Sequence, residues 1–333
     1  MSKKVRWGII SVAKIGWEKV IPAMQQGEFT EVVAIASREQ PRAAGWAERL
    51  GIPRAYGSYD ELLADKEIDA IYNPLPNHMH LEWSVKAAEA GKHVLCEKPI
   101  GMSSQEAQEL IAARDRTGVK MQEAFMVKTH PQWLFALDQV RKKKIGDLRA
   151  IQGFFSYYNV DAENIRNILE YGGGGVMDIG CYPITTSRFI FGEEPTRVVS
   201  LLERDPNLKT DRLTSAILDF PSGQATFTCS TQLVPYQRMI FFGTKGRVEI
   251  EIPFNAPPDR PCRVFTSEGG FMGTECEIHD IPTCDQYTIQ GDEFSKAILD
   301  DAAVPIPLED SVQNMRVIEA VFRSAEIGKW VEP

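Results

Sequence analysis

Residues 5–16 read VRWGIISVAKIG, which is an apolar run, a short turn of small residues and the start of a helical pattern. A strand that ends in such a turn and leads into a helix is the context that a dinucleotide-binding loop requires. The glycines of the usual G-x-G-x-x-G pattern would fall where this chain has Ser11, Ala13 and Gly16. Ser11 can itself donate to a phosphate, and the amides of a helix start supply an anion site. Taken alone, the turn is also typical of an ordinary strand–helix connection.

The first half of the chain repeats this alternation of strand and helix. Strands are expected at residues 5–10, 32–36, 70–73, 93–96 and 120–125, and helices at 41–50, 81–90, 103–117 and up to about residue 26. Near-continuous apolar strands that alternate with helices indicate a parallel sheet covered on both faces. Right-handed crossovers then predict a doubly wound Rossmann fold.

The second half has a different pattern. A helix is expected at residues 132–143, further helices at 175–191 and 311–327, and strands at 148–158, 196–203, 213–220, 224–231, 238–242 and 247–252. Short strands joined by tight turns predict a mainly antiparallel sheet. We therefore expect an α/β chain with a Rossmann domain at 1–125 and an α+β domain with a large open sheet at 126–333. The C-terminal residues are candidates to pack back across this boundary.

Composition narrows the classes of function. The chain has 333 residues, a net charge of −9 and no basic run longer than RKKK at 141–144, which argues against a nucleic-acid partner. It contains no apolar stretch of about 18 residues and no leader-like segment, so we expect a cytoplasmic protein without a membrane span. Six cysteines without a C-x-x-C pair indicate buried thiols, and five histidines show no metal-ligand spacing.

The end of the second strand bears on the choice of cofactor. An NAD site carries Asp or Glu there to bond the ribose 2′-hydroxyl, but this chain has Ser37 and Arg38. A guanidinium beside a hydroxyl suits a 2′-phosphate through charge-assisted hydrogen bonds. Glu39 falls one or two residues late for the acidic role. The pattern predicts NADP over NAD, and an Arg38 that merely faces solvent is the alternative.

A charged turn, CEKP at residues 96–99, directly follows the strand at 93–96. In open α/β sheets, ligands bind beyond the carboxyl ends of the strands. A lysine that is partly buried there shifts its pKa readily, so Lys98 is a candidate for proton-transfer chemistry. The alternative is a solvated Glu-Lys turn.

Four ordered blocks of sequence match a known family. They are NPLPNHMH at 73–80, AGKHVLCEKP at 90–99, EAFMVKTHPQ at 123–132 and GGGGVMDIGCY at 172–182. On these blocks and the N-terminal turn, the chain resembles the Gfo/Idh/MocA oxidoreductase family over essentially its full length. The resemblance implies an NADP-binding Rossmann domain and a second domain that binds substrate and forms oligomers.

The fourth block indicates a branch of that family. Many members carry Asp-x-Gly-x-His, and here the histidine position is filled by Tyr182. This is similar to the branch of glucose–fructose oxidoreductase, D-xylose dehydrogenase and dimeric dihydrodiol dehydrogenase. An inositol dehydrogenase is therefore not expected.

The resemblance also implies functional residues. It implies that Lys98 and Tyr182 face each other over the nicotinamide and that Asp178 orients the substrate or supports the pair. The implied cofactor-binding residues are Ser11, Ala13, Lys14, Ile15, Ser37, Arg38, Pro74, Leu75, Asn77, His80, Glu97, Lys98 and Tyr287. The implied substrate residues are Lys98, His130, Asp178 and Tyr182, with a purely structural His130 as the alternative. No metal is implied.

The chemistry of alcohol oxidation indicates a role for Lys98 and Tyr182. The cofactor takes a hydride, and the protein must take a proton. An unperturbed tyrosine has a pKa of about 10, which is too high for an efficient base at neutral pH, and a lysine ammonium within about 4–6 Å lowers it. We therefore expect Tyr182 to transfer the proton while Lys98 lowers its pKa and bonds the reacting oxygen. Asp178, four residues before Tyr182, shares its face of a helix or acts as a helix-start anion.

Two further features keep alternatives open. The glycine run at 172–175 is typical of a hinge, of a phosphate-binding nest or of a close backbone approach beneath the substrate, and we favour the last. The second feature is a set of aromatic residues, typical either of a sugar platform or of a core: Trp133, Phe154, Phe155, Tyr157 and Tyr158.

These inferences converge on an NADP-dependent dehydrogenase that oxidises the C1 hydroxyl of an aldose, D-xylose or D-glucose, to the lactone. The alternatives are an aldose–aldose or glucose–fructose type oxidoreductase that retains NADP, a trans-dihydrodiol dehydrogenase, a keto-sugar reductase and a non-catalytic NADP-binding sensor. The open face of the second-half sheet is expected to be apolar at alternate positions, as in residues 216–218 and 225–227. Such a face predicts a homodimer or homotetramer.

Overall fold

The computed structural model describes residues 3–270 and 275–333, which form two compact units. Unit 1 comprises Met1–Met126 and Asp285–Val312. Unit 2 comprises Val127–Cys284 and Gln313–Pro333. The first segment of unit 1 ends at Met126, and residues 285–312 return to that unit, whereas the sequence pattern assigns all residues after 125 to the second domain.

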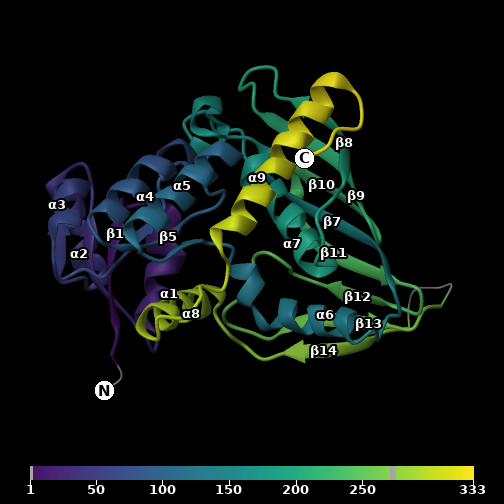
Figure 1. Cartoon of the computed structure of the whole chain (residues 1–333), viewed down its shortest axis with the longest axis horizontal. Coiled ribbons are helices and arrows are strands. Elements are labelled where there is room, and N and C mark those ends of the chain that lie inside the picture. The colour runs from purple at the N-terminus through teal and green to yellow at the C-terminus, as the bar shows by residue number, and fades with distance from the viewer. Residues whose placement is uncertain (1–2, 271–274) are drawn as a thin grey trace. The chain divides into compact units, whose positions relative to one another are not determined.

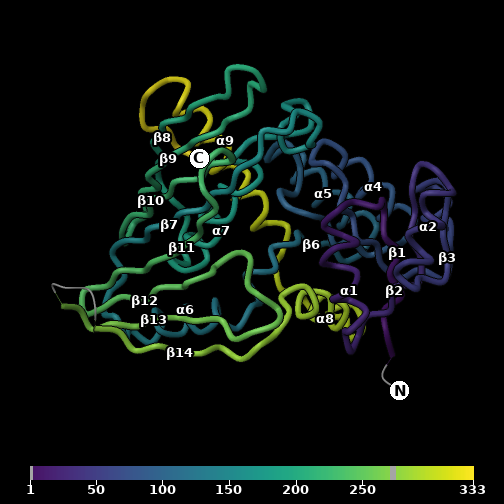
Figure 2. Tube along the Cα trace, turned by 180° about the vertical axis from the view of Figure 1, so that it is seen from behind, coloured from purple at the N-terminus to yellow at the C-terminus, as the bar shows by residue number. Residues whose placement is uncertain are grey.

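Unit 1 is built on a six-stranded sheet with the order β3-β2-β1-β4-β5-β6. Every neighbouring pair of these strands is parallel, so the predicted doubly wound Rossmann fold is confirmed. Figures 1 and 2 show α4 and α5 on one side of the sheet and α1 and α8 on the other. The elements are β1 (Val5–Ile10), η1 (Gly16–Val20), α1 (Ile21–Gln25), β2 (Thr30–Ala36), α2 (Gln40–Leu50), β3 (Arg54–Tyr56), α3 (Tyr59–Ala64), β4 (Ala70–Asn73), η2 (Asn77–Met79), α4 (His80–Glu89), β5 (His93–Cys96), α5 (Ser104–Thr117), β6 (Met121–Glu123) and α8 (Gln286–Leu299).

Local chemistry sets the ends of these helices. The side chain of Ser103 accepts a hydrogen bond from the amide of Glu106, which caps the first turn of α5. The helix stops at Gly118, whose φ of 71° lies in the left-handed region that glycine adopts without steric cost. Because β4 and β5 are parallel, the turns that follow them lie at the same edge of the sheet.

Helix α8 belongs to unit 1 because it packs on the strands that start the chain. The indole Nε1 of Trp7 donates to Ser295 Oγ at 3.0 Å, and the ring of Trp7 lies 5.8 Å from that of Phe294. The carboxylate of Asp292 accepts from the amides of Glu28 and Phe29. A buried Trp N–H needs such a partner, and this one comes from the far end of the chain.

Unit 2 is built on an eight-stranded sheet with the order β14-β13-β12-β11-β7-β10-β9-β8. All neighbouring pairs are antiparallel except β7 and β10, so the predicted mainly antiparallel sheet is confirmed. The elements are η3 (Met126–Thr129), α6 (Pro131–Arg141), β7 (Leu148–Tyr158), η4 (Ile165–Asn167), η5 (Leu169–Tyr171), η6 (Val176–Gly180), α7 (Cys181–Phe191), β8 (Arg197–Arg204), β9 (Asp211–Phe220), β10 (Gly223–Ser230), β11 (Gln232–Gly243), β12 (Arg247–Ile250), β13 (Cys262–Ser267), β14 (Glu277–Ile281) and α9 (Leu308–Ile327). The short η3 begins in the last residue of unit 1, and α9 begins in its second segment.

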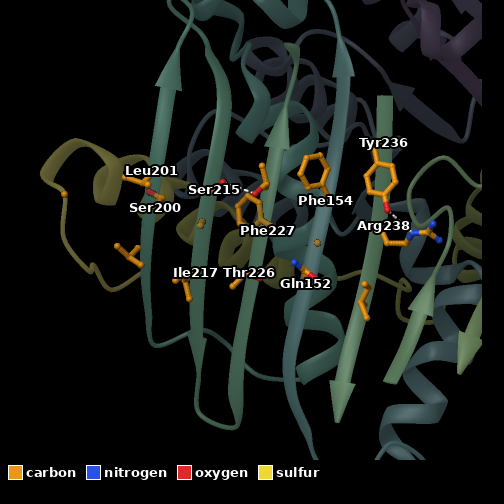
Figure 3. A pocket seen from close by; sticks show the side chains of 16 residues that line it. Gln152, Phe154, Ser200, Leu201, Ser215, Ile217, Thr226, Phe227, Tyr236 and Arg238 are labelled. Atoms are coloured by element: carbon orange, nitrogen blue, oxygen red, sulfur yellow. Dashed lines mark hydrogen bonds between the residues drawn. The ribbon is translucent and has the colours of Figure 1, made fainter. Parts of the chain in front are cut away.

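Figure 3 shows helices behind this sheet, and side chains such as Leu201 are exposed on its opposite face, called here the open face. The open face carries a groove of about 590 Å³ whose lining includes Phe154, Leu201 and Ile217. The expected alternation is present, but most of the apolar residues proposed for the open face are buried. The buried ones are Ala216, Leu218, Ala225 and Phe227.

Candidate active site

The carboxyl edge of the six-stranded sheet collects most of the residues predicted to bind a cofactor. The strand order changes direction between β1 and β4, and in open α/β sheets this is where a crevice forms for ligands. The turns after β1, β2, β4 and β5 all end at this edge. They carry Ser11, Ala13, Lys14, Ile15, Ser37, Arg38, Pro74, Leu75, Asn77, Glu97 and Lys98.

The turn after β1 closes tightly without the usual glycines. Ser11 has a φ of 72°, the left-handed conformation that a first glycine would normally adopt. Its Oγ accepts a hydrogen bond from the amide of Ala13 at 3.3 Å, which stabilises the turn locally. A Cβ at Gly16 would make only ordinary contacts at 3.9 Å. The serine thus performs the backbone task of the missing glycine, and the turn fits a dinucleotide pyrophosphate.

Two arginines follow β2. Ser37 is buried at the end of the strand, and Arg38 is exposed beside it. Burial raises the pKa of Tyr59, while the positive charges of Arg38 and Arg42 lower it, so both guanidiniums lie within electrostatic reach of the Tyr59 hydroxyl. Neither arginine is in a salt bridge with another residue that the structure describes. The pair fits a phosphate.

Arg42 was missed by sequence reasoning. It lies in the first turn of α2, which holds no acidic residue. A cation there opposes the helix dipole and brings no local stability. Such a misplaced charge, four residues after Arg38, is the signal that could have identified it.

Glu97 interacts with two tyrosines of unit 1, of which Tyr72 is buried and Tyr287 is partly buried. The hydroxyl of Tyr72 donates to Glu97 Oε1 at 2.7 Å. Burial and the charge of Glu97 raise the pKa of Tyr72 and of Tyr287. The structure thus brings Tyr287 of α8 into electrostatic reach of the turn after β5. Lys98 follows Glu97 and is half-buried.

His80 connects the turns after β4 and β5. It is fully buried, with Nδ1 at 2.8 Å from the Pro99 carbonyl oxygen and Nε2 at 2.7 Å from that of Leu75. Burial lowers the pKa of His80 to about 4, and the charge of Lys98 acts in the same direction. Both ring nitrogens are engaged, so the prediction that His80 contacts the cofactor is replaced by one that it positions the two turns.

In unit 2, Asp178 is held by two side chains. The hydroxyl of Tyr157 in β7 donates to Asp178 Oδ2 at 2.6 Å. Arg166 Nε lies 3.3 Å from Asp178 Oδ1 in a salt bridge. Tyr157 was one of the aromatic residues considered for a sugar platform. Arg166 was missed, and its position 12 residues before Asp178 carries no periodic signal.

Tyr182 is the second residue of α7, one turn after Asp178. The expected single α-helix is instead a π-helical turn, η6, that continues into α7. Such turns are frequently found at functional sites. Tyr182 is buried, and its ring packs against Phe155 and Phe254 with centroid distances of 5.9 and 5.2 Å. This aromatic packing fixes the ring.

The other aromatic residues divide between different roles. Trp133 is fully buried, and its Nε1 donates to the Pro253 carbonyl at 2.8 Å. Phe154 lies on the open face of the sheet, and Tyr158 is exposed. The five aromatic residues therefore do not share one surface of unit 2.

His130 caps α6. It is fully buried, its Nδ1 accepts from the amide of Gln132 at 3.2 Å, and its Nε2 lies 3.4 Å from Cys284 Sγ. Burial lowers the pKa of His130 to about 4. This is the structural role that was the alternative to substrate contact.

The described residues contain neither a metal-binding cluster nor a membrane-spanning helix. No cluster of three or more His, Cys, Asp or Glu side chains in residues 3–270 and 275–333 is arranged to hold a metal ion. No helix in that part of the chain has the length and apolar character needed to cross a membrane.

Residues 5–125 match the family model described as "Oxidoreductase family, NAD-binding Rossmann fold", and residues 133–249 match the "GFO/IDH/MocA C-terminal domain". The chain belongs to the GFO/IDH/MocA family. It is therefore an NAD(P)-dependent oxidoreductase, as the four sequence blocks predicted.

Relatives of known sequence or structure match this GFO/IDH/MocA protein along its whole length. An uncharacterised oxidoreductase of Rhizobium meliloti is 48% identical over 98% of both chains. The D-xylose 1-dehydrogenase (NADP+) 2 of Haloferax volcanii is 36% identical over 98% of this chain and 99% of its own. The 3-ketoreductase KijD10 of Actinomadura kijaniata, solved with NADP and TDP-benzene, is 29% identical with a TM-score of 0.90, covering 97% of this chain and 98% of its own. The predicted family branch is confirmed.

Proposed function

We propose that this chain is an NADP-dependent sugar dehydrogenase that oxidises the C1 hydroxyl of an aldose, D-xylose or D-glucose, to the lactone. The observation that carries the proposal is the fixed carboxylate of Asp178, held by Tyr157 and Arg166 one helical turn before Tyr182. The likeness to a D-xylose 1-dehydrogenase over 98% of the chain supports the substrate class.

The proposed cofactor is NADP, with NAD as the weaker candidate. Support comes from Arg38 and Arg42, which are near Tyr59 and lack a salt-bridge partner among the described residues, and from buried Ser37. Guanidiniums bind a phosphate through charge-assisted hydrogen bonds. NADP also appears in the name of the related D-xylose 1-dehydrogenase and in the solved structure of KijD10, which supports the same cofactor. When bound, NADP supplies a hydride acceptor.

We assign the remaining cofactor contacts to the carboxyl edge of the sheet. The turn at Ser11, Ala13, Lys14 and Ile15 would hold the pyrophosphate, and the turn at Pro74, Leu75 and Asn77 would lie along the dinucleotide. Glu97 and Tyr287 would complete the edge near the nicotinamide. His80 is retained as a positioning residue for the turns.

The chemical roles follow from proton balance. Tyr182 accepts the proton of the sugar hydroxyl, and Lys98 lowers the pKa of that tyrosine and bonds the reacting oxygen. Asp178 orients the substrate, because a carboxylate accepts hydrogen bonds from sugar hydroxyls. These assignments rest on the sequence blocks, and His130 is not among them because its ring is engaged within unit 2.

A substrate panel tests the reaction. Purified protein is assayed with D-xylose, D-glucose, other aldoses and trans-dihydrodiols, each with NADP and with NAD. We expect NADPH formation with D-xylose or D-glucose and weaker activity with NAD. Turnover of a sugar pair without added cofactor would instead indicate an oxidoreductase that retains NADP. Tight NADP binding without turnover of any substrate would indicate a sensor.

A second candidate is a keto-sugar reductase. It is favoured by the likeness to a 3-ketoreductase, which covers 97% of this chain. In that direction Tyr182 would be the general acid, because the reduced carbonyl oxygen must gain a proton. NADPH consumption with keto-sugars, together with no oxidation of aldoses, would favour this function.

A further inference from the structure

Asp211 is a buried carboxylate that the proposed reaction does not use. It begins β9, is 1% exposed, and forms no salt bridge with a residue that the structure describes. Its Oδ2 accepts a hydrogen bond from the amide of Val176 at 2.6 Å, and Thr214 Oγ1 lies 3.5 Å from the same oxygen. A buried charge needs such partners to persist, and its main partner here is the first residue of η6.

The glycine run at 172–175 is packed around this carboxylate. A Cβ at Gly174 would lie 2.0 Å from Asp211 Oδ1, and one at Gly175 would lie 3.2 Å from Oδ2. Gly174 also has a φ of 124°, which other residues rarely adopt. A Cβ at Gly173 would lie 2.6 Å from the carbonyl oxygen of Arg166. The glycines therefore allow a close approach of backbone to carboxylate, so the hinge interpretation is not needed.

The same turn carries Asp178. The amide of Asp178 donates to the carbonyl of Gly174 at 3.0 Å, and the amide of Gly174 donates to that of Arg166 at 2.9 Å. Arg166 in turn pairs with the Asp178 carboxylate. Any shift of Gly174 would thus move the amide of Asp178 and the residue that holds its side chain.

The charges of Asp178 and Asp211 also act on the same tyrosine, Tyr157. Burial and the charge of Asp178 raise the pKa of Tyr157, and the charge of Asp211 adds to that effect. Burial also raises the pKa of Asp211 to about 7. The hydrogen bond from the Val176 amide and the charge of Arg204, in the adjacent strand β8, lower this pKa but are outweighed by burial. The buried thiol of Cys229 in β10 also lies within reach of both acids.

We propose that Asp211 is a positioning residue: its carboxylate holds the glycine turn and the start of η6 in the conformation that presents Asp178 and Tyr182 to the substrate. The proposal rests on the proposed function, because it assigns Asp211 a task only through the residues that act there.

The test compares Asp211→Ala, Asp211→Asn and Asp205→Ala. Asp205 is a matched control because it is also buried, and it accepts from the amides of Asn207 and Leu208 and from the side chain of Gln232, none of which belongs to the glycine turn. Hydrogen–deuterium exchange reports on residues 172–182, and kcat and KM are measured with D-xylose and NADP.

Loss of a buried hydrogen-bond acceptor leaves the Val176 amide unpaired, so Asp211→Ala should raise exchange at 172–182 and lower kcat by about tenfold or more. KM for NADP should stay unchanged, because the proposed cofactor residues lie in unit 1. Asp211→Asn keeps an acceptor oxygen and should retain kcat within about threefold of wild type. Asp205→Ala should change neither exchange at 172–182 nor kcat.

Unchanged exchange at 172–182 in Asp211→Ala would overturn the proposal, whether or not D-xylose is a substrate. So would a kcat for folded Asp211→Asn as low as that of Asp211→Ala. If Asp211→Ala does not fold, hydrogen–deuterium exchange at 172–182 and kcat are measured instead on Asp211→Asn and on Gly175→Ala. The second variant brings a Cβ toward the carboxylate. Failure of the proposed function is recognised separately, by undiminished turnover of Tyr182→Phe.

Discussion

At the scale of single residues, Arg38 and Arg42 show that the role of a charged side chain is inferred from its surroundings. Both are exposed, and either would pass for a solvated side chain in isolation. Their shared effect on Tyr59 and the absence of salt bridges to the described residues support the proposal that they bind a phosphate. We infer that they set the preference for NADP over NAD.

Substitution of either arginine tests this inference. Arg38→Ala and Arg42→Ala should each raise KM for NADP by about tenfold or more, because a hydrogen bond to a charged group contributes about 1.5–3 kcal/mol. KM for NAD should change little. Arg49→Ala is the control, since Arg49 also belongs to α2 but lies over the ring of Trp46. Equal effects on NADP and NAD would contradict a role at the 2′-phosphate.

Residues at strand ends were predictable, whereas their partners were not. Lys98 and Arg38 follow apolar strands, and such positions are read directly from the sequence. Tyr157 reaches Asp178 from 21 positions away, through the register of β7, which no local pattern specifies. The engagement of His80 and His130 is likewise set by tertiary packing, so their burial could not be predicted.

At the scale of elements, long apolar runs were predicted well and short or mixed ones were missed. The ranges for β1, β4, β5 and β7 match the structure at both ends. Among the strands and α-helices, the missed elements are β3, α3, β13, β14 and α8. Strand β3 has three residues, all only half-buried, so it lacks the apolar signal of a core strand. Helix α8 buries polar residues such as Gln286 and Gln290 with its apolar ones, which obscures its pattern.

The cap of α6 predicts an acid-sensitive stability. His130 has a pKa of about 4 in the folded protein against 6.5 in an unfolded chain. Its contribution is complete above pH 6.5 and is lost as the pH falls from 6.5 toward 4, where only the unfolded chain binds the proton. The free energy of unfolding should fall by about 1.4 kcal/mol per pH unit from this residue.

Urea unfolding of wild type and His130→Asn between pH 7 and pH 5 measures this contribution. Asparagine preserves a side-chain cap for α6 but does not titrate. The variant should therefore lose stability less steeply on acidification than wild type does. Parallel pH dependences of the two proteins would show that His130 does not couple to unfolding.

At the scale of the whole molecule, the open face of the eight-stranded sheet exposes apolar side chains, and Figure 3 labels several of those that line its groove. Leu201 is 80% exposed there, and Phe154, Ile217 and Tyr236 line the same groove. Apolar side chains gathered on one face are typical of a protein–protein interface. We propose that a second copy of this chain covers it, as a homodimer or a pair of dimers.

Light scattering of wild type and Leu201→Glu tests this proposal. We expect a dimer or tetramer for wild type, and a smaller species for the variant, because a buried carboxylate without a partner opposes association. Leu169→Glu is the control, since Leu169 is exposed in η5, away from the groove. A monomeric wild type, or equal masses for wild type and Leu201→Glu, would contradict the proposed interface.

We propose that Tyr182 transfers the proton during oxidation of an aldose with NADP. The direct test is the rate of NADPH formation from D-xylose by wild type and by Tyr182→Phe, which keeps the ring that packs against Phe155 and Phe254. Because general acid–base catalysis contributes about 10²–10⁴-fold, kcat of the variant should fall by that order while KM for NADP is retained. A Tyr182→Phe enzyme that turns over D-xylose as fast as wild type would contradict the claim.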